Sequence, residues 1–317
     1  RKHKLPDKGL RVRRFPRLVL LGVLGLLCGC QTADAKVPFQ RGTLPHDGLE
    51  RSYVFSLPAA ASDKSPLVLL LHGALGTGET TWHYTEFPLL AKREGFILIA
   101  PDGIDKVWND GREATLYGRK SKADDVGFLL ALIDKAIADY HADPRRIYLS
   151  GISNGGMMSY RLLCEHHTRF AAVAPVIATL PQARAERCPA EAVVPIQITL
   201  ATADPILPWA GGVSDKTGVA MVSGAETFDY FARRAGCQSS TRTVLPNKTD
   251  RDGSTITEIS AVGCKAAVQM LRVDGGGHQW INGRDGWFVR QIIGRANRDA
   301  DGAELVWSFF KAAGAQR

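Results

Sequence analysis

The stretch GISNGGMM, residues 151–158, carries Ser153 between two glycines, after one apolar run and before a helix-like run. A serine on a sharp strand-to-helix turn of this kind can act as a nucleophile, because small neighbours let the backbone take a strained conformation. The pattern alone is weak, since glycine makes up 32 of the 317 residues, and the alternative is a polar residue in an ordinary glycine-rich loop. The residues available to activate this serine therefore decide the interpretation.

A serine hydroxyl at its ordinary pKa is a poor nucleophile and needs a general base. Only His166, His167 and His278 follow Ser153 in the chain. The first two fall at the far end of the helix expected after the serine, whereas His278, in DGGGHQW, directly follows the apolar run AVQMLRV. The sequence predicts His278 as the base, with a surface-loop histidine as the alternative.

The acid that orients the base is expected to be Asp204, in ATADPILPW. It comes just past the apolar run VVPIQITL and before a proline that ends any continuation of a strand. Other aspartates that follow the serine fall in probable loops, a helix or a polar turn: Asp215, Asp229, Asp250 and Asp252. The alternative for Asp204 is an Asp-Pro pair that only nucleates a bend.

Two backbone amides are expected to face the oxyanion that forms when such a serine attacks a carbonyl. Asn154 begins the helix after the serine, so its amide points out of the helix N-terminus. The second donor is the amide of Ala74 in LLLHGALG, where His72 and Gly73 follow an apolar run. A plain turn at the end of a strand is the alternative for this loop.

The elements that must position these residues alternate along the chain. Short runs rich in Val, Ile and Leu predict strands of a parallel sheet buried on both faces, at 67–73, 95–103, 145–151, 193–200 and 267–273. Helical periodicity appears in DDVGFLLALIDKAIADY, with Asp124 as its cap, and in AELVWSFFKAA near the C-terminus. This alternation predicts a doubly wound α/β sheet whose ligands bind at the carboxyl ends of the strands, where the candidate residues fall.

The net charge of +8 is concentrated at the N-terminus, because residues 1–29 hold eight Lys and Arg against the single acid Asp7. The remainder is nearly neutral and lacks the basic footprint of a nucleic-acid-binding protein. The basic stretch leads into LVLLGVLGLLCGC, which is too short to span a bilayer and is typical of a signal peptide. The final LCGC resembles a bacterial lipobox, in which Cys30 would carry lipid. A plain secretory signal is the alternative.

Four cysteines remain beyond the signal, and an exported chain favours their pairing. Three connectivities are possible, and the sequential one is favoured because each bond closes a local loop: Cys164 with Cys188, and Cys237 with Cys264. Four buried free thiols are the alternative. No C-x-x-C pair or Cys/His cluster predicts a zinc site.

Six ordered motifs carry a family resemblance: HGALG, APDGIDKVWNDGR, DDVGFLLALIDKA, GISNGGMMSYRL, TADPILPW and GGGHQW. Over about residues 50–312 the chain resembles the secreted esterase family that groups polyhydroxybutyrate depolymerase-like enzymes with feruloyl and acetylxylan esterases. The resemblance implies an α/β-hydrolase fold and a triad of Ser153, Asp204 and His278, and it supports the sequential disulfides. The short connection between AAVAPVIATL and VVPIQITL leaves little room for a large cap domain, and the expected reaction needs no cofactor. One departure is LATAD, where relatives usually carry HGTAD, so Leu200 and Ala201 replace a histidine and a glycine.

The resulting hypothesis is a serine carboxylic-ester hydrolase that works through an acyl-enzyme. Trp108, Trp209 and Trp280 flank the catalytic loops and are expected to line the substrate site, although tryptophan is also a common core residue. Such a wall suits short-chain, hydroxycinnamoyl or oligomeric hydroxyalkanoate esters. The alternatives are a serine peptidase of the same fold and a non-catalytic surface lipoprotein that only binds.

The expected organisation is a lipoprotein-type signal peptide at 1–29, a tether at 30–49 and a catalytic domain at 50–317. The protein is then a periplasmic or cell-surface lipoprotein, or else a secreted one, and contacts membrane only through its lipid. The sequence does not indicate the oligomeric state or the natural ester.

Overall fold

The computed structural model describes residues 37–59, 64–112, 119–283 and 287–315. The expected signal peptide and Cys30 lie outside these residues. One compact unit extends from Lys36 onward, and it contains all the elements described below.

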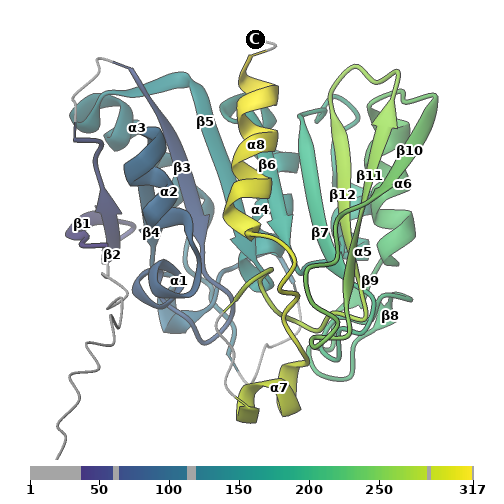
Figure 1. The fold of residues 1–317 in the computed structure, drawn as a ribbon. Helices are drawn as coiled ribbons and strands as arrows, with labels where there is room; N and C mark the ends of the chain where they lie inside the picture. The colour runs from purple at the N-terminus through teal and green to yellow at the C-terminus, as the bar shows by residue number, and fades with distance from the viewer. Residues whose placement is uncertain (1–36, 60–63, 113–118, 284–286, 316–317) are drawn as a thin grey trace, which may run out of the picture. The chain divides into compact units, whose positions relative to one another are not determined.

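The centre of this unit is a ten-stranded sheet in the order β1-β2-β4-β3-β5-β6-β7-β12-β11-β10 (Figure 1). The six strands from β4 to β12 in this order run parallel, and the outer strands on both sides pair antiparallel. The strands are β1 Gln40–His46, β2 Leu49–Ser56, β3 Ser65–Leu71, β4 Ile97–Pro101, β5 Ala142–Ile152, β6 Ala172–Val176, β7 Ile196–Ala201, β10 Ser239–Val244, β11 Thr255–Val262 and β12 Val268–Asp274, with a separate pair of β8 Gly212–Val213 and β9 Ala220–Met221.

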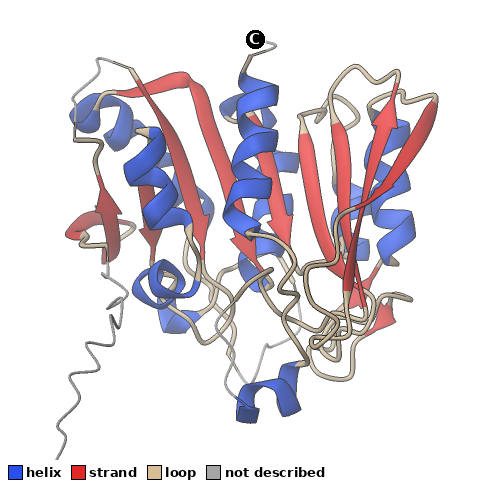
Figure 2. Ribbon diagram, viewed as in Figure 1, coloured by secondary structure: helices blue, strands red, loops and turns tan. Residues whose placement is uncertain are grey.

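Helices cover both faces of the sheet (Figure 2). They are α1 Gly78–Tyr84, α2 Phe87–Glu94, α3 Asp125–Tyr140, α4 Asn154–His166, α5 Gln182–Arg187, α6 Gly224–Arg234, α7 Trp287–Ile293 and α8 Gly302–Gly314, with short 3-10 turns at Ile104–Lys106 and His167–Arg169. The helix expected at 124–140 begins one residue after its cap, where the Asp124 carboxylate accepts from the amide of Gly127 at 3.0 Å.

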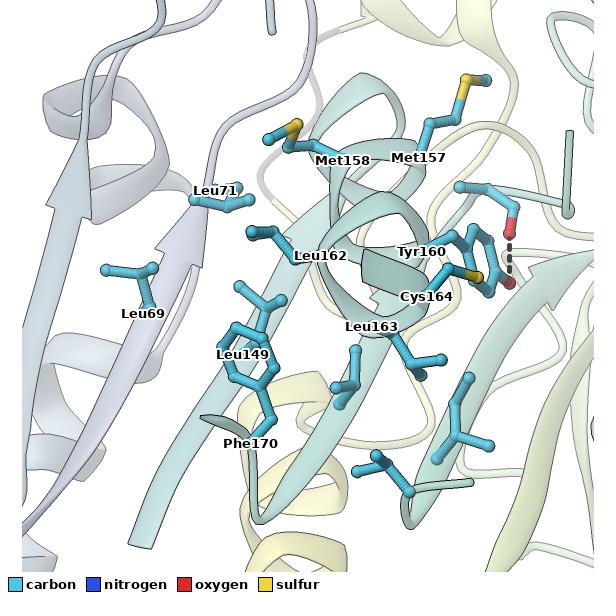
Figure 3. Close-up of a cluster of buried hydrophobic side chains, with 14 of the residues drawn as sticks. Leu69, Leu71, Leu149, Met157, Met158, Tyr160, Leu162, Leu163, Cys164 and Phe170 are labelled. Atoms are coloured by element: carbon cyan, nitrogen blue, oxygen red, sulfur yellow. Dashed lines mark hydrogen bonds between the residues drawn. The ribbon is translucent and has the colours of Figure 1, made fainter. Parts of the chain in front are cut away.

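The two faces of the sheet have separate apolar cores because successive strand residues point to opposite sides. In β3, Leu67, Leu69 and Leu71 pack with residues of α3, α4 and α6, whereas Val68 and Leu70 pack with residues of α2 and α8. Figure 3 shows the first core around α4, whose Met158, Leu162 and Leu163 lie near the leucines of β3 and β5. The helix that follows Ser153 is therefore held firmly against the sheet.

The mainly parallel sheet with helices on both faces confirms the predicted α/β class. Each of the five predicted strands is present, with ends that differ by a few residues. β6 and the antiparallel edge strands were not predicted. One predicted boundary needs correction: residues 40–49, expected in a tether, form β1 and the start of β2, because β1 pairs with β2 along its whole length, from Gln40 with Phe55 to His46 with Leu49.

Both disulfides connect the pairs expected from the sequence. Cys164 and Cys188 join the last turn of α4 to the residue after α5. Cys237 and Cys264 join the segment after α6 to the turn between β11 and β12. Each bond closes a loop of similar length, with sequence separations of 24 and 27 residues, and restricts the unfolded chain accordingly.

Candidate active site

Ser153 lies on a strained turn between β5 and α4, with φ 54° and ψ −115°. This conformation is unusual for a residue with a side chain, and the packing on both sides enforces it. A Cβ at Gly151 would lie 2.3 Å from the carbonyl oxygen of Gly155, and one at Gly155 would lie 2.6 Å from the carbonyl oxygen of His72. The two glycines of the motif are therefore required by close backbone approach, which gives Gly-x-Ser-x-Gly a physical meaning in this chain.

The serine, the histidine and the aspartate singled out in the sequence form one hydrogen-bonded chain. Oγ of Ser153 lies 2.8 Å from Nε2 of His278, and Nδ1 of His278 lies 2.6 Å from Oδ2 of Asp204. An ionised carboxylate can only accept, so Nδ1 donates to Asp204 and the neutral imidazole accepts the serine proton at Nε2. This tautomer is the one that general-base activation of a serine requires.

Asp204 is fixed by the turn that follows β7. Its Oδ1 accepts from the amides of Ile206 and Leu207 at 2.7 and 2.9 Å, which leaves Oδ2 facing His278. The side chain of Asp204 is only 3% exposed. Leu200 and Ala201, the departures from the pattern of relatives, are buried at the end of β7, and the aspartate still reaches the histidine. Two amide donors hold the carboxylate in place without the usual His-Gly pair.

The loop that carries His278 is held by the chain that follows α7. The amide of His278 donates to the carbonyl of Ile293 at 2.6 Å, and the amide of Gly277 donates to that of Arg295 at 2.8 Å. A Cβ at Gly277 would lie 2.5 Å from the carbonyl oxygen of Ile293, so only glycine permits this approach. Tyr84 of α1 adds a further contact by donating its hydroxyl to Gln279 at 2.5 Å.

The side chain of Asn154 anchors the start of α4 to the loop after β4. Its Oδ1 accepts from the amide of Trp108 at 2.7 Å, and its Nδ2 donates to the carbonyl of Trp108 at 3.2 Å and to Oδ2 of Asp110 at 2.8 Å. Asn154 is 1% exposed. The first amides of a helix have no acceptor within the helix, so the Asn154 amide is available at the N-terminus of α4 beside Ser153.

The second expected donor, the amide of Ala74, lies in the turn after β3. It has no hydrogen-bond acceptor among the described residues, whereas the next amide, that of Leu75, donates to the carbonyl of Lys106 at 2.8 Å. Ala74 and Ser153 line the same cavity. This shared wall keeps the Ala74 amide as a candidate donor to an oxyanion at Ser153.

His72 holds this turn from behind. It is fully buried, its Nε2 accepts from the amide of Gly103 at 2.9 Å, and its Nδ1 therefore donates to the carbonyl of Gly73 at 2.7 Å. Burial lowers the pKa of His72 to about 4, so the ring is neutral at physiological pH. The indole of Trp108 completes the support by donating to the carbonyl of His72 at 3.0 Å.

A cavity of about 480 Å³ opens directly at Ser153 and His278. Its walls come from the turn after β3, from α1 and from the end of α7, and they are mostly apolar or small: Gly73, Ala74, Leu75, Gly76, Thr80, Thr81, Tyr84, Ile152, Ile292 and Ile293. Leu75 and Ile292 are 48% and 54% exposed, which places large apolar side chains at the surface of the cavity that Ser153 lines. Such a wall suits an apolar acyl group.

The three tryptophans expected in the site do not line this cavity. Trp108 and Trp280 are 2% and 1% exposed, and their indole nitrogens donate to His72 and to Glu86. Trp209 is half-buried and packs over Gly224 at the start of α6. The expectation is therefore corrected: Trp108 and Trp280 are core residues that support the catalytic loops, because their ring faces are covered by packing.

Sequence reasoning missed the ion pairs behind the site. Arg112 pairs with Asp110, the residue that holds Asn154, and buried Arg51 pairs with Asp125 at 2.6 Å. Asp125 also accepts from the amide of Asn109 at 2.7 Å, so it fixes the loop that carries Trp108. The polar residues of VWNDGR, which follow an expected strand, were the feature of the sequence that could have indicated these ion pairs.

Within the described ranges, no group of three or more His, Cys, Asp and Glu side chains is arranged to hold a metal ion. No helix in the described part of the chain combines the length and the apolar character needed to cross a membrane.

Known proteins resemble this chain in sequence and in fold. Residues 51–180 match the family described as Esterase PHB depolymerase. The putative esterase NocK of Nocardia uniformis subsp. tsuyamanensis is 27% identical over 261 residues, which cover 79% of this chain and 75% of that protein. Feruloyl esterase B of Piromyces equi is 26% identical over 256 residues, which cover 76% of this chain and 45% of that protein. The chain thus spans less than half of the Piromyces relative.

Among solved structures, an acetyl xylan esterase from Aspergillus awamori superposes with a TM-score of 0.54 at 16% identity, covering 76% of this chain and 94% of that one. This likeness shows that the fold is the α/β-hydrolase fold. The sequence matches indicate a carboxylic ester hydrolase. The chain is thus similar to polyhydroxybutyrate depolymerase-like and feruloyl esterase-like enzymes, and the family match covers less than half of its length.

Proposed function

We propose that the protein hydrolyses carboxylic esters through an acyl-enzyme formed on Ser153. His278 takes the serine proton, the serine oxygen attacks the ester carbonyl, and the amides of Ala74 and Asn154 donate to the tetrahedral oxyanion. His278 then gives its proton to the departing alcohol, and a water molecule activated in the same way releases the acid. Asp204 orients the imidazole and stabilises its positive charge.

The observation that carries this proposal is the hydrogen-bonded chain from Ser153 through His278 to Asp204, with both distances below 3 Å, on a strained turn at the N-terminus of a helix. No part of this mechanism needs a cofactor. A protein that only binds would have no use for this geometry, so catalysis is favoured over the non-catalytic alternative.

The test is a hydrolysis screen of purified protein with Ser153→Ala and His278→Ala variants. Both variants should lose several orders of magnitude in kcat, because members of a triad act as a unit, while circular dichroism and Tm remain close to those of the parent. Ser159→Ala is a matched control, since this buried serine of α4 bonds only to the carbonyl of Gly155 within the described residues. Near-normal hydrolysis by Ser153→Ala would refute the mechanism.

For the substrate, we propose short-chain, hydroxycinnamoyl or oligomeric hydroxyalkanoate esters rather than long-chain triglycerides. The cavity of about 480 Å³ beside Ser153 is large enough for an aryl or short aliphatic acyl group, and its lining is mainly apolar. A comparison of kcat/KM for p-nitrophenyl acetate, methyl ferulate, a hydroxybutyrate oligomer and a long-chain ester tests this. The highest kcat/KM on the long-chain ester would contradict it.

We also propose that the protein is exported and attached to a membrane by lipid on Cys30. Two disulfides are consistent with an oxidising compartment, and LCGC resembles a lipobox. The proposed organisation is a cleaved signal at 1–29 followed by a short tether and the catalytic domain.

A further inference from the structure

A second cavity lies beside α4 at the carboxyl edge of the sheet, and it shares no lining residue with the apolar cavity. It has a volume of about 260 Å³ and is lined by the loop after β4, by Met157, by α5 and by the turn before β9. Met157 comes one helical turn after Ser153, and its amide donates to the carbonyl of Ser153 at 2.9 Å. One turn of helix is about 5 Å long, so the backbone of this lining residue lies within about one turn of Ser153.

The walls of this cavity, here called the arginine pocket, carry an excess of positive charge. Arg112, Arg184 and Arg187 line it, and Asp110 is the only acid among the lining residues. Asp110 pairs with Arg112. Arg184 donates to Glu165 at 2.8 Å, but Glu165 is shared with a second arginine of α4, which donates to it at 3.1 Å. Arg187 has no ion pair with any described residue.

Two guanidinium nitrogens in the arginine pocket are buried without a partner. Nη1 of Arg112 and Nε of Arg184 have no hydrogen-bond acceptor among the described residues. The side chain of Arg112 is only 8% exposed, so its Nη1 cannot be satisfied by bulk solvent. A buried donor of this kind is costly unless an acceptor occupies the adjacent space. Nε and Nη2 of Arg112 already hold Asp110, so each of these two arginines offers one nitrogen to a ligand. A carboxylate has two oxygen acceptors and can accept from two such nitrogens at once.

We propose that the arginine pocket binds a carboxylate carried by the alcohol portion of the substrate. This inference rests on the proposed ester hydrolysis. The acyl group occupies the apolar cavity beside Ser153, and the leaving alcohol is a hydroxy acid whose carboxylate reaches the arginines. The acyl–oxygen bond breaks, His278 protonates the departing oxygen, and the hydroxy acid leaves with its carboxylate unchanged. The enzyme then prefers esters of hydroxy acids with a free carboxyl end over their neutral counterparts.

A matched pair of substrates tests this preference: 3-butyryloxybutyrate and its carboxamide, which differ only in the charge of the terminal group. We expect kcat/KM to be about tenfold or more higher for the acid, since a hydrogen-bonded charge pair contributes that much in binding. Arg187→Gln should lower kcat/KM for the acid about tenfold and so remove most of this preference. Arg233→Gln, which removes the same charge from the exposed part of α6, is the control and should keep the preference.

A second variant, Ala183→Glu, places a negative charge at the exposed wall of the arginine pocket and should favour the carboxamide. Equal kcat/KM for the acid and the carboxamide in the parent enzyme would overturn the inference while leaving ester hydrolysis intact. If the parent enzyme hydrolyses neither substrate, the proposed function is refuted instead.

Calorimetry on Ser153→Ala tests whether the arginine pocket binds a hydroxy acid or any small anion. We expect 3-hydroxybutyrate to bind, and Arg187→Gln to weaken this binding about tenfold. Binding of inorganic sulfate alone, with no binding of 3-hydroxybutyrate, would identify a simple anion site and overturn the assignment to substrate.

Discussion

Removing the side chain of Asn154 weakens the support of a proposed oxyanion donor while leaving the three residues of the triad unchanged. Asn154→Ala deletes two hydrogen bonds to the backbone of Trp108 and one to the carboxylate of Asp110. A neutral hydrogen bond contributes about 1 kcal/mol and one to a charged group about 2 kcal/mol, so the free energy of unfolding should fall by about 4 kcal/mol. For a unit of this length, each kcal/mol shifts Tm by about 2 °C, which gives a fall of about 8 °C.

The same variant should lower kcat more than it raises KM. The variant still has a backbone amide at residue 154, but the first turn of α4 loses its hydrogen bonds to the loop after β4. Misplacing one oxyanion donor in this way should lower kcat about 10- to 100-fold. Thermal unfolding and steady-state hydrolysis of p-nitrophenyl acetate measure the two effects. Asn109→Ala is the control: it removes one hydrogen bond from the same loop, to the carbonyl of Ala123 at 3.0 Å, without touching α4.

The control should lower Tm slightly and leave kcat unchanged. The reasoning is refuted if Asn154→Ala lowers Tm as expected but keeps kcat within about twofold of the parent. In that case the side chain only stabilises the fold, and the oxyanion is bound by other groups.

Three further predictions follow from the described contacts and from the N-terminal sequence. Burial lowers the pKa of His72 from 6.5 in the unfolded chain to about 4 in the folded protein, so between these pH values mainly the unfolded chain binds the proton. The free energy of unfolding should therefore fall by up to about 3 kcal/mol as the pH drops from 6.5 to 4, and denaturant titrations should show a smaller fall for His72→Gln. Replacing Cys237 and Cys264 by serine should cost about 3 kcal/mol in urea unfolding but leave kcat unchanged, since Cys264 precedes β12 and His278 follows it, at opposite ends of this strand; a large fall in kcat would contradict this. If Cys30 carries lipid, fractionation should find the native protein with membranes and Cys30→Ser in the soluble fraction, whereas a soluble parent protein would argue for a plain secretory signal.

Much of the candidate site could be predicted from the sequence because it depends on local patterns. Glycines around Ser153 predict a tight turn, an apolar run before each candidate predicts a strand end, and parallel strands bring their carboxyl ends to one edge. The candidates for base and acid were then few enough to choose by chain order and position. These local features identified Ser153, Asp204 and His278, and the structure brings all three within hydrogen-bonding distance.

The lining of the cavities depended on side-chain direction, which sequence position does not reveal. Trp280 comes two residues after His278, yet its ring packs beneath the catalytic loop against Phe87 instead of facing substrate. The apolar wall comes instead from the turn after β3 and the end of α7, which are more than 200 residues apart in the chain. The same holds for Arg112 and Arg187, because only the packing of α5 beside the loop after β4 places their charges around one cavity.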